Sequence, residues 1–143
     1  MAGIWDLEET TTSITGGECF ASLFQSVVGS TARSVLQITQ GGTSLTVRAT
    51  DSSTGASCDY TGTASAAAFA LNVTSCTASD LIGAVCPNGA RRDIKLQTGG
   101  YNGSVNGTTA SGTGAETFNV FVSGTSTPVG TLIVNSRFTA SRR

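Results

Sequence analysis

The stretch 34–50, SVLQITQGGTSLTVRAT, carries the pattern that decides the fold. Leu36 and Ile38 alternate with polar residues, and after Gly41-Gly42 apolar residues return at every second position. A period of two is typical of a half-buried strand, and a glycine pair between two such runs is typical of a tight turn. The stretch therefore predicts an antiparallel β-hairpin.

The same period of two continues along the chain on both sides of this hairpin. We expect strands over residues 3–14, 34–40, 44–50, 57–63, 68–75, 91–98, 101–106, 108–122 and 130–140. The run 101–106 continues the sheet of 91–98 around a bulge or bend at Gly99-Gly100. A longer connection, residues 77–90, contains the apolar pair Leu81-Ile82 and a turn.

About eight strands joined by short turns, without crossover helices, predict an all-β, antiparallel up-and-down arrangement in one domain, residues 1–143. Such a meander either closes into a single β-barrel or folds as a two-sheet sandwich. Closure removes exposed strand edges, which favours the barrel.

One segment, from about Glu18 to Val28, has a helical period instead and predicts a short α-helix after the first strand. Its apolar stripe consists of Phe20, Leu23, Phe24 and Val27. The open mouth of the barrel is the nearest apolar surface on which this stripe can pack. We expect the helix there, either as a fixed plug or as a movable lid.

Composition and charge exclude several classes of function. Thr, Ser and Gly make up 59 of the 143 residues, only 12% are charged, and the net charge is −1. No basic run exceeds two residues, so nucleic acid is not an expected partner. No apolar stretch approaches the roughly 20 residues of a membrane helix. The chain has no histidine, which removes the Ser-His-Asp and Cys-His catalytic arrangements and the usual zinc sites, and no metal or cofactor is expected.

Four cysteines, Cys19, Cys58, Cys76 and Cys86, form an even set without a Cys-x-x-Cys pair. We expect disulfides rather than a metal site or free buried thiols, and hence a secreted or periplasmic protein. The start of the chain lacks an apolar secretion signal, so Met1 is expected to replace a removed leader. Three pairings are possible. We favour Cys58 with Cys76, which the hairpin register brings roughly opposite, and Cys19 with Cys86.

The triplet Gly3-Ile4-Trp5 at the start of the first strand resembles the Gly-x-Trp signature of the lipocalins and the wider calycin group, which includes avidins. The resemblance implies that Trp5 closes one end of an eight-stranded barrel and that an arginine packs over its ring, a cation–π contact. Arg137 is the counterpart by position, with Arg142 as the fallback. The helix follows the first strand rather than the seventh, so no particular ligand is implied. The chain also resembles Thr/Gly-rich secreted domains of soil bacteria.

The inward apolar phase of the strands identifies a candidate ligand site. An eight-stranded barrel is just wide enough to be filled by side chains or to hold one small ligand, and both outcomes remain open. For a ligand cavity, the expected lining residues are Tyr60, Phe69, Leu71, Ile94, Leu96, Tyr101, Phe118 and Val120 on the strands, with Phe20 and Phe24 on the helix. A Tyr60 or Tyr101 hydroxyl would orient the ligand.

Strand phase also turns two carboxylates, Glu9 and Glu116, toward the barrel interior, unless they lie at its rim in water. The sequence therefore predicts a barrel that binds a small hydrophobic or amphipathic molecule in its interior. Two alternatives remain open. One is an extracellular domain that assembles through its Thr-rich faces. The other is a cofactor-free cyclase or isomerase that uses Glu116 or a tyrosine and needs a strongly shifted carboxylate pKa.

Overall fold

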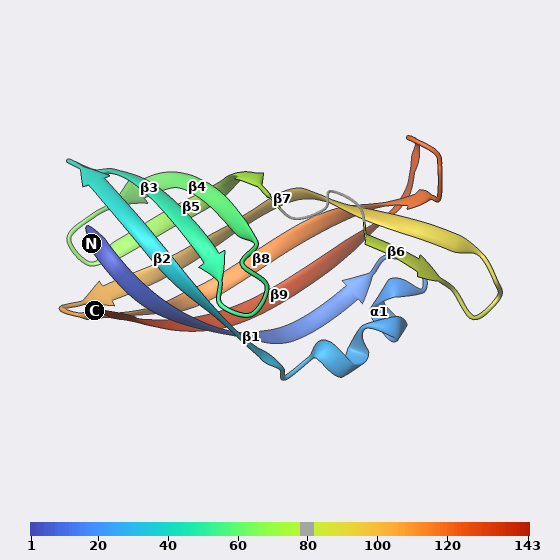
Figure 1. The fold of residues 1–143 in the computed structure, drawn as a ribbon, viewed down its shortest axis with the longest axis horizontal. Coiled ribbons are helices and arrows are strands. Elements are labelled where there is room, and N and C mark those ends of the chain that lie inside the picture. Colours follow the sequence, from blue (N-terminus) through green and yellow to red (C-terminus); the bar gives the residue numbers. More distant parts are fainter. Residues whose placement is uncertain (78–81) are drawn as a thin grey trace.

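The computed structural model describes residues 1–77 and 82–143, and these form an all-β protein (Figure 1). Two short helical pieces, α1 (Phe20–Leu23) and the 3-10 turn η1 (Gln25–Val27), follow the first strand. The strands in chain order are β1 (Gly3–Gly16), β2 (Thr31–Gly41), β3 (Ser44–Asp51), β4 (Ser57–Ala64), β5 (Ala68–Cys76), β6 (Ile82–Val85), β7 (Arg91–Asn106), β8 (Thr109–Val122) and β9 (Pro128–Arg142).

The strands pair antiparallel in the order β5-β4-β3-β2-β1-β9-β8-β7-β6, and β5 pairs in addition with β7. That last pairing, residues 68–72 with 100–104, closes eight strands into an up-and-down barrel. The predicted barrel is therefore confirmed over the sandwich. Strand β6 lies outside the ring and pairs with residues 91–94 of β7.

Four long strands run beyond the barrel and form an extension of it. Residues 3–10 of β1 pair with β2, whereas its pairing with β9 continues to Gly16. Strands β7, β8 and β9 likewise continue past the point where β5 ends, and β6 adds to the outer edge of β7 (Figure 1). The strands β1, β9, β8, β7 and β6 therefore make one open sheet, which we call the extension.

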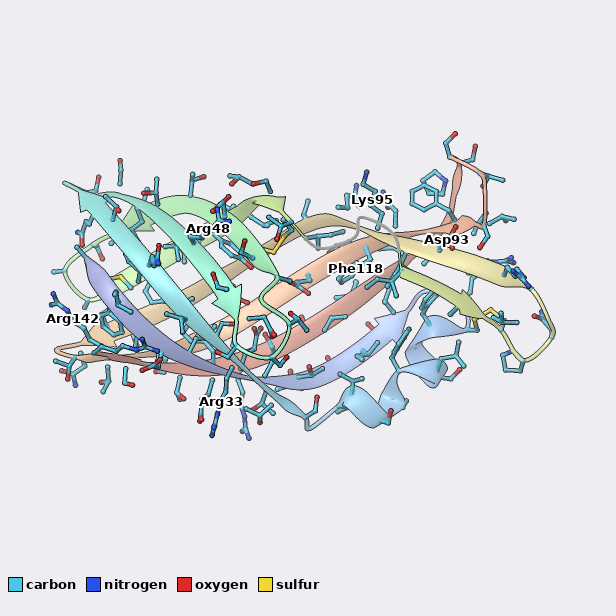
Figure 2. The ribbon with its side chains drawn as sticks, in the orientation of Figure 1. Arg33, Arg48, Asp93, Lys95, Phe118 and Arg142 are labelled. Carbon is cyan, nitrogen blue, oxygen red and sulfur yellow. A yellow bond between two sulfur atoms is a disulfide. The ribbon has the colours of Figure 1, made fainter. Side chains whose placement is uncertain are left out.

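The barrel and the extension each have an apolar core. The barrel core contains Trp5, Leu7, Ile38, Leu45, Val47, Tyr60, Ala64, Phe69, Leu71, Ala110, Phe138 and Ala140. The second core, in the extension, contains Ile14, Phe20, Ile94, Val120 and Leu132. A bulge between Thr11 and Ser13 changes the phase of β1, so that Ile14 faces the second core. Charged side chains such as Arg33, Arg48 and Arg142 project outward (Figure 2).

The helix is shorter than the predicted range of residues 18–28. Glu18 has a φ of 54°, in the left-handed region, and cannot belong to a right-handed helix. After one α-turn the chain tightens into the 3-10 turn at Gln25, which rotates the apolar stripe. Leu23 and Val27 are consequently 39% and 38% exposed, whereas Phe20 is fully buried. In residues 1–77 and 82–143, no helix has the length and apolar character to cross a membrane.

The helical segment does not plug the Trp5 end of the barrel. Phe20 packs in the second core, against residues of β1, β7, β8 and β9, and Phe24 stacks on it at 5.6 Å between ring centroids. The apolar stripe was expected at the barrel mouth. The long strands extend beyond the barrel, however, and form a second apolar surface on which the stripe packs instead.

Both expected disulfides are present. Cys58 and Cys76 face each other in the register of β4 and β5, with 4.0 Å between their Cα atoms. Cys19 and Cys86, 5.6 Å apart at Cα, join the start of α1 to the end of β6. Two disulfides fit an oxidising extracellular or periplasmic environment.

Two further details differ from the predictions. The connection 77–90 contains the strand β6, which is too short and too exposed to give a two-residue pattern; Leu81 lies outside the described residues. Strand β7 is continuous as expected, but its bulge falls between Leu96 and Thr98 rather than at Gly99-Gly100.

Candidate binding site in the barrel interior

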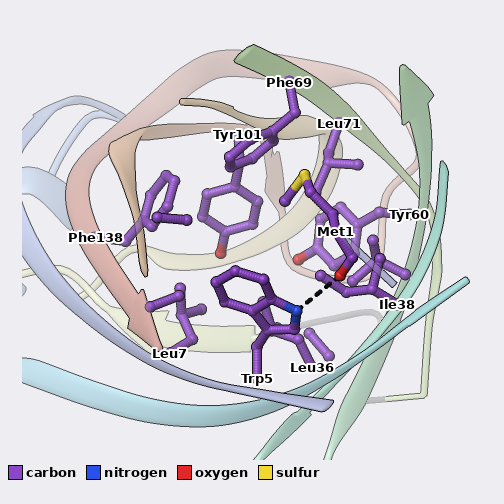
Figure 3. A pocket seen from close by; sticks show the side chains of 14 residues that line it. Met1, Trp5, Leu7, Leu36, Ile38, Tyr60, Phe69, Leu71, Tyr101 and Phe138 are labelled. Carbon is purple, nitrogen blue, oxygen red and sulfur yellow. Dashed lines mark hydrogen bonds between the residues drawn. The ribbon is translucent and has the colours of Figure 1, made fainter. Parts of the chain in front are cut away.

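The Trp5 end of the barrel is an apolar chamber that side chains fill almost completely (Figure 3). Tyr60, Phe69, Leu71 and Tyr101 line it together with Trp5. The remaining cavity measures about 20 Å³, and one water molecule needs roughly 10–15 Å³ of such space. Of the two outcomes left open by the sequence, this end of the barrel therefore shows an interior filled by side chains rather than a ligand cavity.

Met1 and Trp5 close this chamber together. The Trp5 side chain is 1% exposed, and its indole Nε1 donates a hydrogen bond of 2.8 Å to the Met1 carbonyl oxygen. The Met1 ammonium group donates to Gln40 Oε1 at 2.7 Å. The Met1 side chain lies among the lining residues (Figure 3).

The resemblance to the calycin group implied that an arginine packs over the Trp5 ring, and Arg137 does not occupy that place. Arg137 lies opposite Thr10 in the register of β1 and β9 and is exposed, because its neighbours Ser136 and Phe138 take the inward phase. The prediction for Arg137 is therefore wrong. Arg142 pairs with Trp5 in the register but is also exposed, and its guanidinium group lies over Gly3.

The ten predicted lining residues do not form one site. Four of them, Tyr60, Phe69, Leu71 and Tyr101, line the apolar chamber. Five belong to or pack against the second core: Phe20, Phe24, Ile94, Phe118 and Val120. Leu96 is half-buried opposite Phe118. Inward phase was correct for these strands, but phase does not reveal how far along a strand the barrel ends.

A layer of polar side chains separates the two apolar cores. We call it the polar layer; it consists of Glu9, Tyr60, Tyr101, Glu116 and Ser136. The Tyr101 hydroxyl donates to Glu9 Oε2 at 2.8 Å, and the Ser136 hydroxyl donates to Glu9 Oε1. The prediction that Glu9 and Glu116 face the interior is confirmed.

The strand register brings these groups together. Glu9 on β1 lies opposite Phe138 of β9, and Glu116 on β8 lies opposite Val134 of β9. Ser136 lies between those two β9 residues and is 7% exposed. On the neighbouring strand β7, Gly99 lies opposite Glu116. A Cβ at Gly99 would stand 3.3 Å from the Glu116 Cγ. Glycine at that position leaves the room that the carboxylate side chain occupies.

The environment shifts the pKa values of three groups in the layer. Burial, and then the charge of Glu9, raise the pKa of the Glu116 carboxyl to about 7. Burial and the charge of Glu116 raise the pKa of Tyr60 to about 12, and burial and Glu9 raise the pKa of Tyr101 further. Near neutral pH the tyrosines are hydrogen-bond donors, and Glu116 can either give or accept a proton.

A pocket of about 180 Å³ opens beside the polar layer. Its lining combines carboxylates and hydroxyls with apolar side chains: Glu9, Thr11, Val27, Ser30, Ala32, Glu116, Val134 and Ser136. The end of the helical segment, through Val27 and Ser30, therefore borders this opening. Such a pocket offers a small molecule both apolar side chains and carboxyl groups to contact.

Sequence reasoning missed Ser136 as a site residue, whereas the inward apolar phase of its strand did indicate Val134. One signal was available, because Ser136 occupies the inward phase of its strand between Val134 and Phe138. A serine at a core position is costly unless its hydroxyl has a partner, and Glu9 is that partner. The approach of Val27 and Ala32 depends on the path of the chain after α1, which the pattern does not reveal.

Within the described ranges, no cluster of three or more Cys, His, Asp or Glu side chains could hold a metal ion. Comparison with known proteins finds no matching family model, no matching curated protein and no matching solved structure. Beyond the Gly3-Ile4-Trp5 triplet, the likeness to the calycin group therefore rests on the closed eight-stranded antiparallel barrel.

Proposed function

We propose that this protein is a secreted or periplasmic barrel that binds a small amphipathic molecule in the pocket beside its polar layer. The observation that carries the proposal is the composition of that pocket of about 180 Å³, which Val27 and Val134 line together with Glu9, Glu116 and Ser136. Ligand sites are typically concave and partly apolar, with a few convergent polar groups that orient the ligand.

The other end of the barrel does not support a larger apolar guest. The chamber at Trp5 leaves about 20 Å³, which is too small for a fatty acid or a retinoid. A guest there would have to displace the Met1 side chain and break the hydrogen bond between Trp5 Nε1 and the Met1 carbonyl oxygen.

A nuclear magnetic resonance titration tests the proposal. Benzyl alcohol, benzylammonium and benzoate are added separately to the isotope-labelled protein, and backbone amide shifts are followed. We expect at least one of them to bind, with the largest shifts at Glu9, Ser30, Glu116 and Val134.

Substitution of Ala32, an exposed residue of the pocket wall, gives a variant that blocks the site without touching either core. We expect Ala32→Trp to weaken binding at least tenfold. The matched control is Ala66→Trp, at an exposed alanine outside the pocket, which should bind as the parent does. Shifts that cluster around Trp5, or no saturable shifts with any of the three probes, would refute the proposed function.

A further inference from the structure

Several carboxylates on the outside of this protein form ion pairs with arginines, whereas the two carboxylates of the polar layer do not. Four acidic residues on the outside each have an arginine partner: Asp6 with Arg143, Glu8 with Arg33, Glu18 with Arg92 and Asp59 with Arg48. Over the described part of the chain, neither Glu9 nor Glu116 has an arginine or lysine within ion-pair distance. The two carboxylates are therefore half-buried without a cation beside them among the described residues.

The groups that face Glu116 add no positive charge. Glu9 on β1, Tyr60 on β4 and Tyr101 on β7 interact with it electrostatically. Ser136 on the neighbouring β9 is neutral, and Arg137 of the same strand points outward. Two carboxylates brought close together without a cation repel each other, and burial makes that repulsion stronger than it would be in water.

The two carboxylates differ in how they are held. Both oxygens of Glu9 accept hydrogen bonds, from Tyr101 and from Ser136, and these bonds fix the position of the carboxylate. No hydrogen bond to the Glu116 carboxyl is recorded among residues 1–77 and 82–143. Glu9 is thus held in place by its hydrogen bonds, whereas the carboxyl group of Glu116 is available to a ligand in the pocket.

We propose, building on the amphipathic-ligand function above, that the pocket takes a small organic cation, whose ammonium group lies between Glu9 and Glu116 while its apolar part contacts Val27 and Val134. Binding of the cation drives the Glu116 carboxyl group to release its proton to solvent, so one positive charge enters as another leaves. No bond of the ligand is made or broken.

The pocket itself favours this class of ligand. Its volume of about 180 Å³ suits a small amine rather than a peptide or a lipid. Its mouth is bordered by Val27 and Ala32, which can contact an alkyl or aryl group, while the hydroxyl of Ser30 can accept a further ammonium hydrogen bond. The raised pKa of Glu116, about 7, means that the site responds to pH within the physiological range.

Isothermal titration calorimetry with benzylammonium, benzyl alcohol and benzoate tests the inference, at about pH 8 and about pH 5.5, on either side of the Glu116 pKa. At the higher pH we expect benzylammonium to bind at least tenfold more tightly than benzyl alcohol, and benzoate to bind least. At the lower pH, where Glu116 holds its proton, affinity for benzylammonium should fall at least tenfold. Titrations near pH 7 in two buffers of different ionisation enthalpy should show proton release on binding.

Three variants separate the site from the surface. Glu116→Gln should abolish both the pH dependence and the proton release, and Glu9→Gln should weaken benzylammonium binding at either pH. The control is Glu8→Gln, which removes the same charge one residue away on the outer face and should behave as the parent does. If Glu9→Gln does not fold, Glu116→Gln alone still decides the question, because its carboxyl has no structural partner among the described residues.

The outcomes distinguish this inference from the function on which it rests. Equal affinity for benzyl alcohol and benzylammonium, or a preference for benzoate, would overturn the cation and leave an amphipathic site standing. Binding of benzylammonium without proton release would overturn the role of Glu116. Failure of all three probes would remove the proposed function as well.

Discussion

Inward glycines set the space available to the polar layer. A Cβ at Gly114 would stand 2.4 Å from the Ser136 Oγ and 2.8 Å from the Tyr101 Cε1, the two groups that hold Glu9. A Cβ at Gly103 would stand 2.8 Å from the Phe69 Cζ. At these positions glycine is used for close approach rather than for a turn. The geometry of the carboxylate pair thus depends on residues that have no side chain.

Gly114→Ala should therefore destabilise the protein. The added methyl group must displace Ser136 or the Tyr101 ring, and such overpacking costs about 1–3 kcal/mol. Urea unfolding measures the change. Gly41→Ala is the matched control, because Gly41 has no positive φ and nothing lies within 4 Å of its Cβ position, so its stability should stay within about 0.5 kcal/mol. Equal effects of the two substitutions would contradict the packing role of Gly114.

At the scale of elements, the sequence pattern correctly predicted the strands, their hairpins and the inward phase of their side chains. It did not predict features that depend on pairing between strands far apart in the chain. The hairpin 34–50 and the inward phases of Trp5 and Glu9 follow from a period of two, and they are correct. The place where the barrel ends depends on pairings between distant strands, such as β5 with β7, which no local pattern encodes. For that reason the sequence pattern places Ile94 and Val120 in the same cavity as Tyr60, although they belong to the second core.

The two disulfides should differ in what they stabilise. Loop-closure entropy predicts that the free energy of unfolding falls by about 4 kcal/mol without Cys19–Cys86, which spans 67 residues, and by about 3 kcal/mol without Cys58–Cys76, which spans 18.

Of the two disulfides, it is Cys19–Cys86 that ties α1 to β6. Replacing it in Cys19→Ala/Cys86→Ala should therefore also increase hydrogen exchange in residues 20–23 and 82–85. Cys58→Ala/Cys76→Ala is the control for that local effect. Unchanged exchange in α1 after loss of Cys19–Cys86 would show that Phe20 packing alone holds the segment.

At the scale of the whole molecule, one continuous antiparallel sheet closes around the barrel core and continues as an open sheet on which the second core packs, with the polar layer between the two cores. A fully apolar interior would be more stable, because Glu116 contributes a carboxyl group that burial and Glu9 oppose when it is ionised. The layer therefore makes the stability of the entire fold depend on pH.

The direction of that dependence follows from the pKa of Glu116, which is raised from 4.5 to about 7 in the folded protein. Between these two values the folded state binds more protons than the unfolded state, so the free energy of unfolding falls as pH rises. The loss across this window is about 2–3 kcal/mol after allowance for the partial exposure of the group, at 1.36 kcal/mol per pKa unit. Asp51, whose pKa is lowered to about 2, acts in the opposite direction and only below about pH 4.

Urea unfolding at intervals between about pH 5 and about pH 8 measures how the free energy of unfolding depends on the titration of Glu116. The folded and unfolded pKa values of Glu116 set this pH window. The parent protein should lose stability steadily, whereas Glu116→Gln should be nearly flat and more stable than the parent at the upper end. Glu8→Gln, on the exposed side of the same barrel, should keep the slope of the parent. A Glu116→Gln variant with the parental slope would mean that Glu116 is solvated like any surface carboxylate. Glu116 would then already be ionised at neutral pH, and cation binding could not release a proton from it.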